Sequence, residues 1–158
     1  MSSEKLVLPA LNPDAVLPRT GSNYPEPLKA RVAGRSKRSL GDAAGLKNFG
    51  VNQVHLPPGT ASSIRHWHTR QDEFVYVLTG ELTLITNAGE QVLQAGMAAG
   101  FPAGKADGHQ LVNRSQSDAV YLEMGDRSSG DKVVYPDDDL TATQFTRWSF
   151  THKDGSVY

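Results

Sequence analysis

The sequence predicts an all-β protein, an antiparallel barrel or sandwich, on the strength of three observations. Short runs of apolar and β-branched residues follow one another at regular intervals from about residue 49 to residue 124. Turn residues separate the runs, for example Gly80 and the tripeptide Asn87-Ala88-Gly89. No segment of useful length repeats its apolar residues at the helical period. Short strands joined by tight turns are typical of a β-barrel or β-sandwich.

Length and composition restrict the protein further. A chain of 158 residues suits one domain with one core. The net charge of −1 gives no long-range attraction for nucleic acid or for an anionic membrane, so a small molecule is the expected partner. The absence of cysteine excludes thiolate ligands and cysteine nucleophiles, which leaves histidine and carboxylate for any metal. No secretory or membrane-spanning apolar run is present, and we expect a cytoplasmic protein.

Residues 1–45 are expected to form an extended N-terminal arm. The arm contains prolines that interrupt every potential helix, namely Pro9, Pro13, Pro18, Pro25 and Pro27. Its short apolar pieces, residues 6–8 and 16–17, are candidates for edge strands on the same domain or on a second subunit. A symmetric homodimer through strand addition is therefore expected. The basic cluster from Lys29 to Arg38 lacks interleaved aromatic residues, and we interpret it as a solvated loop.

The β-barrel is predicted over residues 46–125. Its strands are expected at residues 49–56, 64–68, 73–79, 81–86, 91–93, 109–113 and 119–124. A loop with four glycines and Pro102 occupies residues 96–108. Residues 126–158 are expected to pack back onto the barrel as a C-terminal segment, with a strand at residues 133–135 and the aromatic residues Phe145, Trp148 and Phe150.

Polar residues at strand positions mark the candidate site. His66 and His68 lie two residues apart, so their rings leave the same face of a strand. Glu73 follows after a short turn at the start of the next strand, and His109 opens a later one. Burying two imidazoles and a carboxylate inside a small barrel without partners costs several kcal/mol, by the order of magnitude of polar desolvation. A bound metal ion removes that cost.

These residues resemble the two histidine motifs of the cupins, which are small jelly-roll barrels. The first motif corresponds to Gly59, His66, His68, Glu73 and Gly80, and the second to Gly96, Pro102, Gly104, His109 and Asn113. This sequence has one extra residue between Gly59 and His66, and two extra residues between Gly104 and His109. The resemblance implies a cupin-type double-stranded β-helix that binds one metal ion.

The resemblance also implies which residues hold the metal. In cupins the two histidines and the glutamate of the first motif bind the ion together with the histidine of the second, which here are His66, His68, Glu73 and His109. Such a ligand set suits Mn²⁺, Fe²⁺, Ni²⁺ or Zn²⁺. The wider sequence is similar to a bacterial group of single-domain cupins that are often labelled as candidate sugar-phosphate isomerases.

Three functions follow as hypotheses. The first is a metal-dependent isomerase or epimerase acting on a small sugar or sugar phosphate, with the metal as Lewis acid. The second is an Fe²⁺ dioxygenase that cleaves a carbon–carbon bond, and the third is a non-catalytic protein that binds or senses a small ligand. For the isomerase, Tyr121 and Glu123 are candidate catalytic residues, provided that their face of the strand points inward. Lys105 is the candidate phosphate ligand, and Asp107 lies beside it at the cavity mouth.

Overall fold

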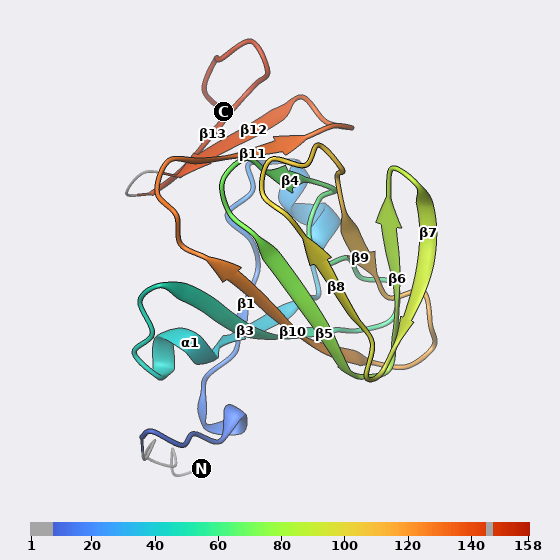
Figure 1. Cartoon of the computed structure of the whole chain (residues 1–158). Helices are drawn as coiled ribbons and strands as arrows, with labels where there is room; N and C mark the ends of the chain where they lie inside the picture. Colours follow the sequence, from blue (N-terminus) through green and yellow to red (C-terminus); the bar gives the residue numbers. More distant parts are fainter. Residues whose placement is uncertain (1–7, 145–146) are drawn as a thin grey trace.

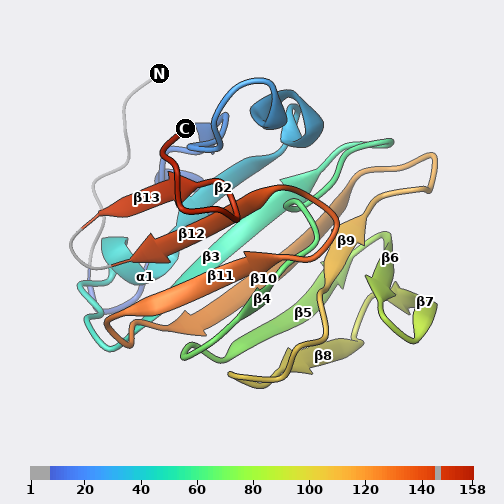
Figure 2. The same ribbon diagram turned by 90° about the horizontal axis from the view of Figure 1, so that it is seen from above.

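The computed structural model describes residues 8–144 and 147–158, and its regular structure is almost entirely β-strand (Figure 1). The largest sheet is antiparallel and has six strands in the order β1-β2-β3-β10-β5-β8. Its strands are β1 (Arg19–Thr20), β2 (Ser36–Ser39), β3 (Phe49–Leu56), β10 (Ala119–Asp126), β5 (Glu73–Thr79) and β8 (Ala98–Phe101). Figure 2 shows β3, β10 and β5 side by side at the centre of this sheet.

Two smaller antiparallel sheets complete the fold. The four-stranded sheet has the order β13-β12-β11-β4, formed by β13 (Trp148–Thr151), β12 (Leu140–Gln144), β11 (Asp131–Tyr135) and β4 (Trp67–His68). The three-stranded sheet has the order β7-β6-β9, formed by β7 (Gly89–Gln94), β6 (Glu81–Thr86) and β9 (Gln110–Val112). A bridge between His66 and His109 connects the two sheets. The jelly-roll barrel is therefore not closed by continuous strand pairing.

Strand alternation decides which side chains enter the interior. On β5, Val75 and Val77 are buried, whereas the side chains between them and beyond them are exposed. Glu73 has the same parity as these two valines, so its carboxylate enters the same interior. On β10, Ala119 and Tyr121 are buried. The interior face of β10 is thus the one that also carries Glu123.

The apolar core lies in two clusters on either side of the histidines. The first cluster joins the six-stranded and three-stranded sheets, and its buried members are Val54, Leu56, Val75, Val77, Leu82, Leu84, Leu93, Leu111, Ala119 and Tyr121. The second cluster joins the four-stranded sheet to the arm, and its buried members are Val32, Ile64, Val133, Tyr135, Leu140 and Ala142. Both the arm and the C-terminal strands therefore contribute to the interior, and the division of the chain at residues 45 and 125 stays a prediction.

Most of the strands predicted between residues 49 and 124 are confirmed, with two differences in this range and two more in the arm. The strand predicted at residues 64–68 is restricted to β4, and β8 forms inside the segment that was predicted as a loop. In the arm, the edge strand is β1 at Arg19–Thr20 instead of residues 16–17, and residues 6 and 7 lie outside the described part of the chain. The basic segment is not simply a solvated loop, because Ser36–Ser39 forms β2 and pairs with β3.

Helical structure is limited to short pieces. They are the α-helix α1 (Leu40–Ala43) and the 3₁₀-helices at Pro13–Ala15 and Leu28–Val32. Within the described residues, no helix is both long and apolar enough to span a membrane. In the C-terminal segment, Trp148 and Phe150 lie on β13, and Phe145 falls outside the described residues. Phe150 packs against the second core cluster.

Candidate metal centre and its cavity

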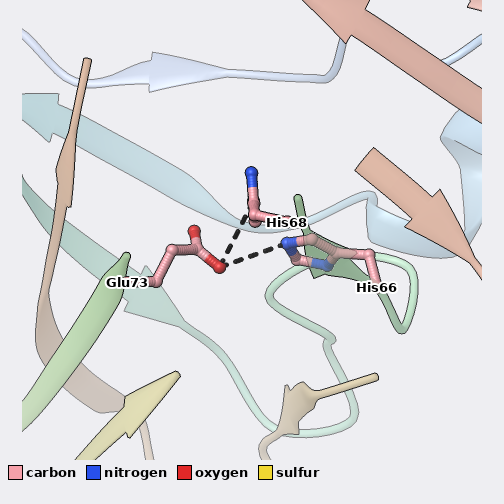
Figure 3. A group of neighbouring side chains, drawn as sticks. All are labelled: His66, His68 and Glu73. Carbon is pink, nitrogen blue, oxygen red and sulfur yellow. Dashed lines mark ion pairs between the residues drawn. The ribbon is translucent and has the colours of Figure 1, made fainter. Parts of the chain in front are cut away.

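The two predicted histidines and the glutamate converge on one point. His68 lies on β4, His66 immediately precedes that strand, and Glu73 begins β5 (Figure 3). One potential ligand atom from each of these residues lies within 4.8 Å of the other two. The Nε2 atoms of His66 and His68 are each 3.4 Å from Oε2 of Glu73. Nε2 of His109 approaches the same oxygen at 2.7 Å, so the structure brings all four predicted ligands together.

Hydrogen bonds on the far side of two imidazoles fix their orientation. Nδ1 of His66 lies 2.8 Å from the carbonyl oxygen of Ile64, and Nδ1 of His68 lies 2.6 Å from Oδ2 of Asp131. A carbonyl or carboxylate oxygen can only accept, so Nδ1 of each ring carries the proton. Nε2 of each ring is therefore the nitrogen that is left to bind a metal, which would replace any proton that it shares with Glu73.

His109 is held in a different way. Its ring stacks on Phe101, with ring centroids 3.6 Å apart and ring planes 4° from parallel. Its Nδ1 atom is buried and has no hydrogen-bond partner among the described residues. The stacking, together with the backbone bridge to His66, points Nε2 of His109 at the carboxylate of Glu73.

The donor set fits a divalent transition metal. His66, His68 and Glu73 present ligand atoms within 4.8 Å of one another, and His109 joins them through its contact with Glu73; His66 and His109 are buried. A half-buried carboxylate with three imidazoles around it is a ligand set that Mn²⁺, Fe²⁺, Ni²⁺ and Zn²⁺ all accept. The protein therefore has a candidate metal centre at these residues, and the kind of metal is not fixed by the ligands.

The charges at the cluster influence one another strongly. Burial by itself raises the pKa of Glu73, but hydrogen bonds from His109, His66 and His68 outweigh burial and hold the pKa well below its usual range. Burial lowers the pKa of His68, but Glu73 and Asp131 outweigh it and raise the pKa to about 9. Glu73 is consequently ionised at neutral pH, ready to act as an anionic ligand.

The cluster lies in the wall of a cavity of about 490 Å³. Ligand pockets of this size accommodate one small molecule. Besides the cluster, the wall contains polar side chains from three parts of the chain: Arg19, Asn23, Tyr24, Arg35 and Lys37 from the arm, Ser62, Ser63, Tyr121 and Glu123 from the barrel, and Tyr135 from β11.

The two predicted catalytic residues both reach this cavity. Burial raises the pKa of Tyr121 well above its usual value, and its hydroxyl has no hydrogen-bond partner among the described residues. Burial raises the pKa of Glu123, but Lys37 outweighs it and lowers the pKa overall. The Nζ atom of Lys37 lies 2.8 and 3.0 Å from the two carboxylate oxygens of Glu123. At neutral pH the cavity thus offers a neutral hydroxyl beside an ionised carboxylate.

The predicted substrate ligands lie elsewhere. Lys105 and Asp107 line a separate cavity of about 30 Å³, beyond His68 and His109. The side chain of Lys105 is 67% exposed and its Nζ is 4.0 Å from Asp107, whose other carboxylate oxygen accepts from the backbone of Asn87. The prediction followed the second histidine motif along the chain, whereas the cations of the main cavity come from the arm.

Sequence reasoning missed these arm residues for an identifiable reason. Arg35 and Lys37 were part of the basic cluster assigned to a solvated loop, yet both line the main cavity. A strand over residues 35–39 would place Arg35, Lys37 and Ser39 on one face and Ser36 and Arg38 on the other. Neither face has an apolar side chain, so the sequence does not indicate which face points inward. The pairing of β2 with β3 shows which face points inward, because Lys37 lies opposite Val54, whose side chain is fully buried.

The fold and site define a cupin-type protein, and comparison with known sequences agrees. Residues 52–125 match the family described as a cupin domain. No match was found among curated proteins.

Solved structures extend the similarity over nearly the whole chain. A sugar phosphate isomerase of the cupin superfamily from Silicibacter pomeroyi is 46% identical over 95% of this chain and 96% of that one, with a TM-score of 0.92. A protein from Acidithiobacillus ferrooxidans, named as a candidate sugar phosphate isomerase, is 29% identical over 86% of each chain, with a TM-score of 0.75. The chain belongs to the cupin superfamily.

A more distant structure shares the fold alone. The polyketide cyclase RemF from Streptomyces resistomycificus is 18% identical over 76% of this chain and 80% of that one, with a TM-score of 0.61. At this level of identity the cupin fold does not determine the reaction.

Proposed function

We propose that this cupin is a metal-dependent isomerase or epimerase that acts on a small sugar phosphate. The observation that carries the proposal is the convergence of three imidazoles and one carboxylate at the wall of a cavity that also contains Tyr121 and Glu123. The 46% identical protein from Silicibacter pomeroyi bears the name of such an enzyme and supports the substrate class.

His66, His68, Glu73 and His109 would hold the metal, which we propose to be Mn²⁺, Fe²⁺, Ni²⁺ or Zn²⁺. When bound, the metal acts as a Lewis acid that polarises a carbonyl group and stabilises the negative charge that develops on its oxygen. The chain holds these ligands in a buried place, where such an electrostatic effect is stronger than in water.

The chain's own residues would move the proton. An aldose–ketose isomerase takes a proton from the carbon next to a carbonyl and returns it to the neighbouring carbon. Glu123 is ionised through its contact with Lys37, so its carboxylate is able to accept that proton and give it back. The neutral hydroxyl of Tyr121 is a donor to a substrate oxygen, because burial raises its pKa.

Turnover of phosphorylated sugars tests the proposal directly. The metal-loaded protein should interconvert at least one aldose phosphate and its ketose, measured by NMR on a panel of three- to six-carbon sugar phosphates. Glu123→Gln should lower kcat about 10²- to 10⁴-fold, the usual contribution of a general base, with its metal content unchanged. Glu90→Gln, in an exposed pair with Arg114, is the matched control and should behave as the wild type.

Other outcomes would replace the proposal. Oxygen uptake that depends on an enolisable substrate in the iron-loaded protein would identify a dioxygenase. Tight binding of a small ligand without turnover would identify a sensor.

We also propose that the protein is a cytoplasmic homodimer that associates through the N-terminal arm. The strand β1 lies at the edge of the six-stranded sheet, and both of its residues are exposed, which leaves that edge open for strand addition. Sizing chromatography at micromolar concentration should show a dimer, and a monomer would refute this association.

A further inference from the structure

Arg35 has an unusual environment in the main cavity. Gly34, with a φ of +91°, turns the chain into this position, and a Cβ atom there would lie 2.8 Å from Cγ2 of Thr60. One terminal nitrogen of Arg35 donates to the carbonyl oxygen of Ser62. Its Nε atom is buried without a hydrogen-bond partner among the described residues. A buried N–H donor without an acceptor is unfavourable, so the described residues satisfy this guanidinium only in part, and the rest of its side chain lines the cavity.

The other cations of the cavity differ from Arg35. Lys37 is neutralised by Glu123 at 2.8 Å. Arg19 is exposed on β1 and donates to Oγ of Ser39 at 3.3 Å. In the described part of the chain, neither Arg19 nor Arg35 lies within 4.0 Å of a carboxylate oxygen, so both carry an uncompensated positive charge. Arg35 is the more enclosed of the two.

The balance of charge in the cavity favours an anionic ligand. Of the described residues in its wall, Arg19, Arg35 and Lys37 are cationic, whereas Glu73 and Glu123 are anionic. A divalent metal at the cluster adds two further positive charges. The positive charge of Arg35 also acts on two tyrosines in the cavity wall. Burial raises the pKa of Tyr121 and of Tyr135, and the charge of Arg35 partly opposes that rise at both hydroxyls.

We propose that Arg35 is the principal ligand of a phosphate subsite in the main cavity, with Arg19 as a second cation at its edge. The planar guanidinium carries five donors in a fork that matches phosphate oxygens, and only one of its nitrogens is occupied by Ser62. The substrate's phosphate group is thus bound by the N-terminal arm, and Lys105 has no part in it. This subsite rests on the proposed function for its substrate class but not for its existence.

Binding of inorganic phosphate tests the subsite without requiring turnover. The purified, metal-loaded protein should bind phosphate saturably in isothermal titration calorimetry at low ionic strength. Arg35→Gln should weaken binding about 10- to 100-fold, the usual effect of losing charge-assisted hydrogen bonds, with the metal content unchanged. Arg19→Gln, at an exposed position, should weaken it less and remains informative if Arg35→Gln does not fold. Lys105→Gln and Arg114→Gln should bind as the wild type.

Each contrary result has a definite meaning. Unchanged phosphate affinity in Arg35→Gln, or in Arg19→Gln should Arg35→Gln fail to fold, would show that the guanidinium only supports the Ser62 carbonyl and would overturn the subsite. Loss of binding in Lys105→Gln, or no saturable binding in the wild type, would do the same. Acetate that binds as tightly as phosphate through Arg35 would make the subsite one for carboxylates. Phosphate binding that depends on Arg35 in a protein without isomerase activity would leave the subsite standing and refute the proposed reaction.

Discussion

Asp131 connects the C-terminal strand β11 to the candidate metal centre. Its side chain is fully buried and accepts hydrogen bonds from Nδ1 of His68 at 2.6 Å, from Oγ1 of Thr69 at 3.3 Å and from the backbone N–H of Arg70 at 2.8 Å. These three donors stabilise a buried charge that would otherwise be costly. The carboxylate in turn fixes the tautomer of His68 and strengthens its Nε2 as a ligand.

Replacing Asp131 by Asn should therefore weaken metal binding. Asparagine keeps the size of the side chain but loses the negative charge that orients His68. We expect the affinity for the bound metal to fall about 10- to 100-fold, as is usual for residues that orient metal ligands, when measured by competition with a chelator. Asp118→Asn, in an exposed pair with His55, is the matched control. Equal affinities in the two variants would show that His68 needs no such orientation.

The residue scale also shows what the sequence predicts and what it does not. His66 and His68 were recognisable because the two-residue alternation of a strand is a local property. The contact between His68 and Asp131 joins residues 63 positions apart, and no local pattern marks it. The inward face of β10 could not be chosen in advance, because Tyr121 alternates with Val120 and Leu122, so both faces carry apolar side chains.

At the scale of elements, Gly80 lets the turn between β5 and β6 lie close against the start of β10. It is the turn between β5 and β6, with a φ of +77° that favours glycine. A Cβ atom at this position would lie 2.6 Å from the carbonyl oxygen of Asp118 and 2.8 Å from Cα of Ala119. Both are backbone atoms at the start of β10, so the clash cannot be relieved by a side-chain rotation.

Gly59 offers a matched comparison for Gly80. It has the same φ of +77°, but a Cβ atom there would meet no heavy atom within 4 Å. Gly59→Ala should cost about 1–2 kcal/mol of unfolding free energy from backbone strain alone. Gly80→Ala should cost a further ~1–3 kcal/mol from overpacking. Urea denaturation measures both values, and equal losses in the two variants would contradict the close approach at Gly80.

The strands β2 and β8 escaped prediction because their sequences lack apolar alternation. The strand β8 reads Ala98-Ala99-Gly100-Phe101, which has low intrinsic strand propensity, and it forms because it pairs with β5. The strand β2 has no apolar residue and forms through pairing with β3. Tertiary pairing supplies in both cases what local propensity lacks, and the cations of the cavity were missed together with β2.

The whole molecule assembles one cavity from three parts of the chain. The barrel supplies the four candidate ligands together with Tyr121 and Glu123, the arm supplies Arg19, Arg35 and Lys37, and the C-terminal strands supply Tyr135. Asp131, also on the C-terminal strands, does not line the cavity but accepts a hydrogen bond from His68. A sequence motif identifies the metal centre because its residues lie close together along the chain. Residues that bind the rest of a ligand come from distant segments, and only the folded chain shows that they share the cavity.

Metal content of the purified protein tests the central claim most directly. Elemental analysis should find about one divalent transition metal ion per chain in the wild type, because four ligands converge at one point. The double variant His66→Ala/His68→Ala should contain essentially none, whereas His55→Ala, an exposed histidine paired with Asp118, should retain the wild-type content. The same metal content in the double variant and the wild type would contradict the assignment of the centre to these residues.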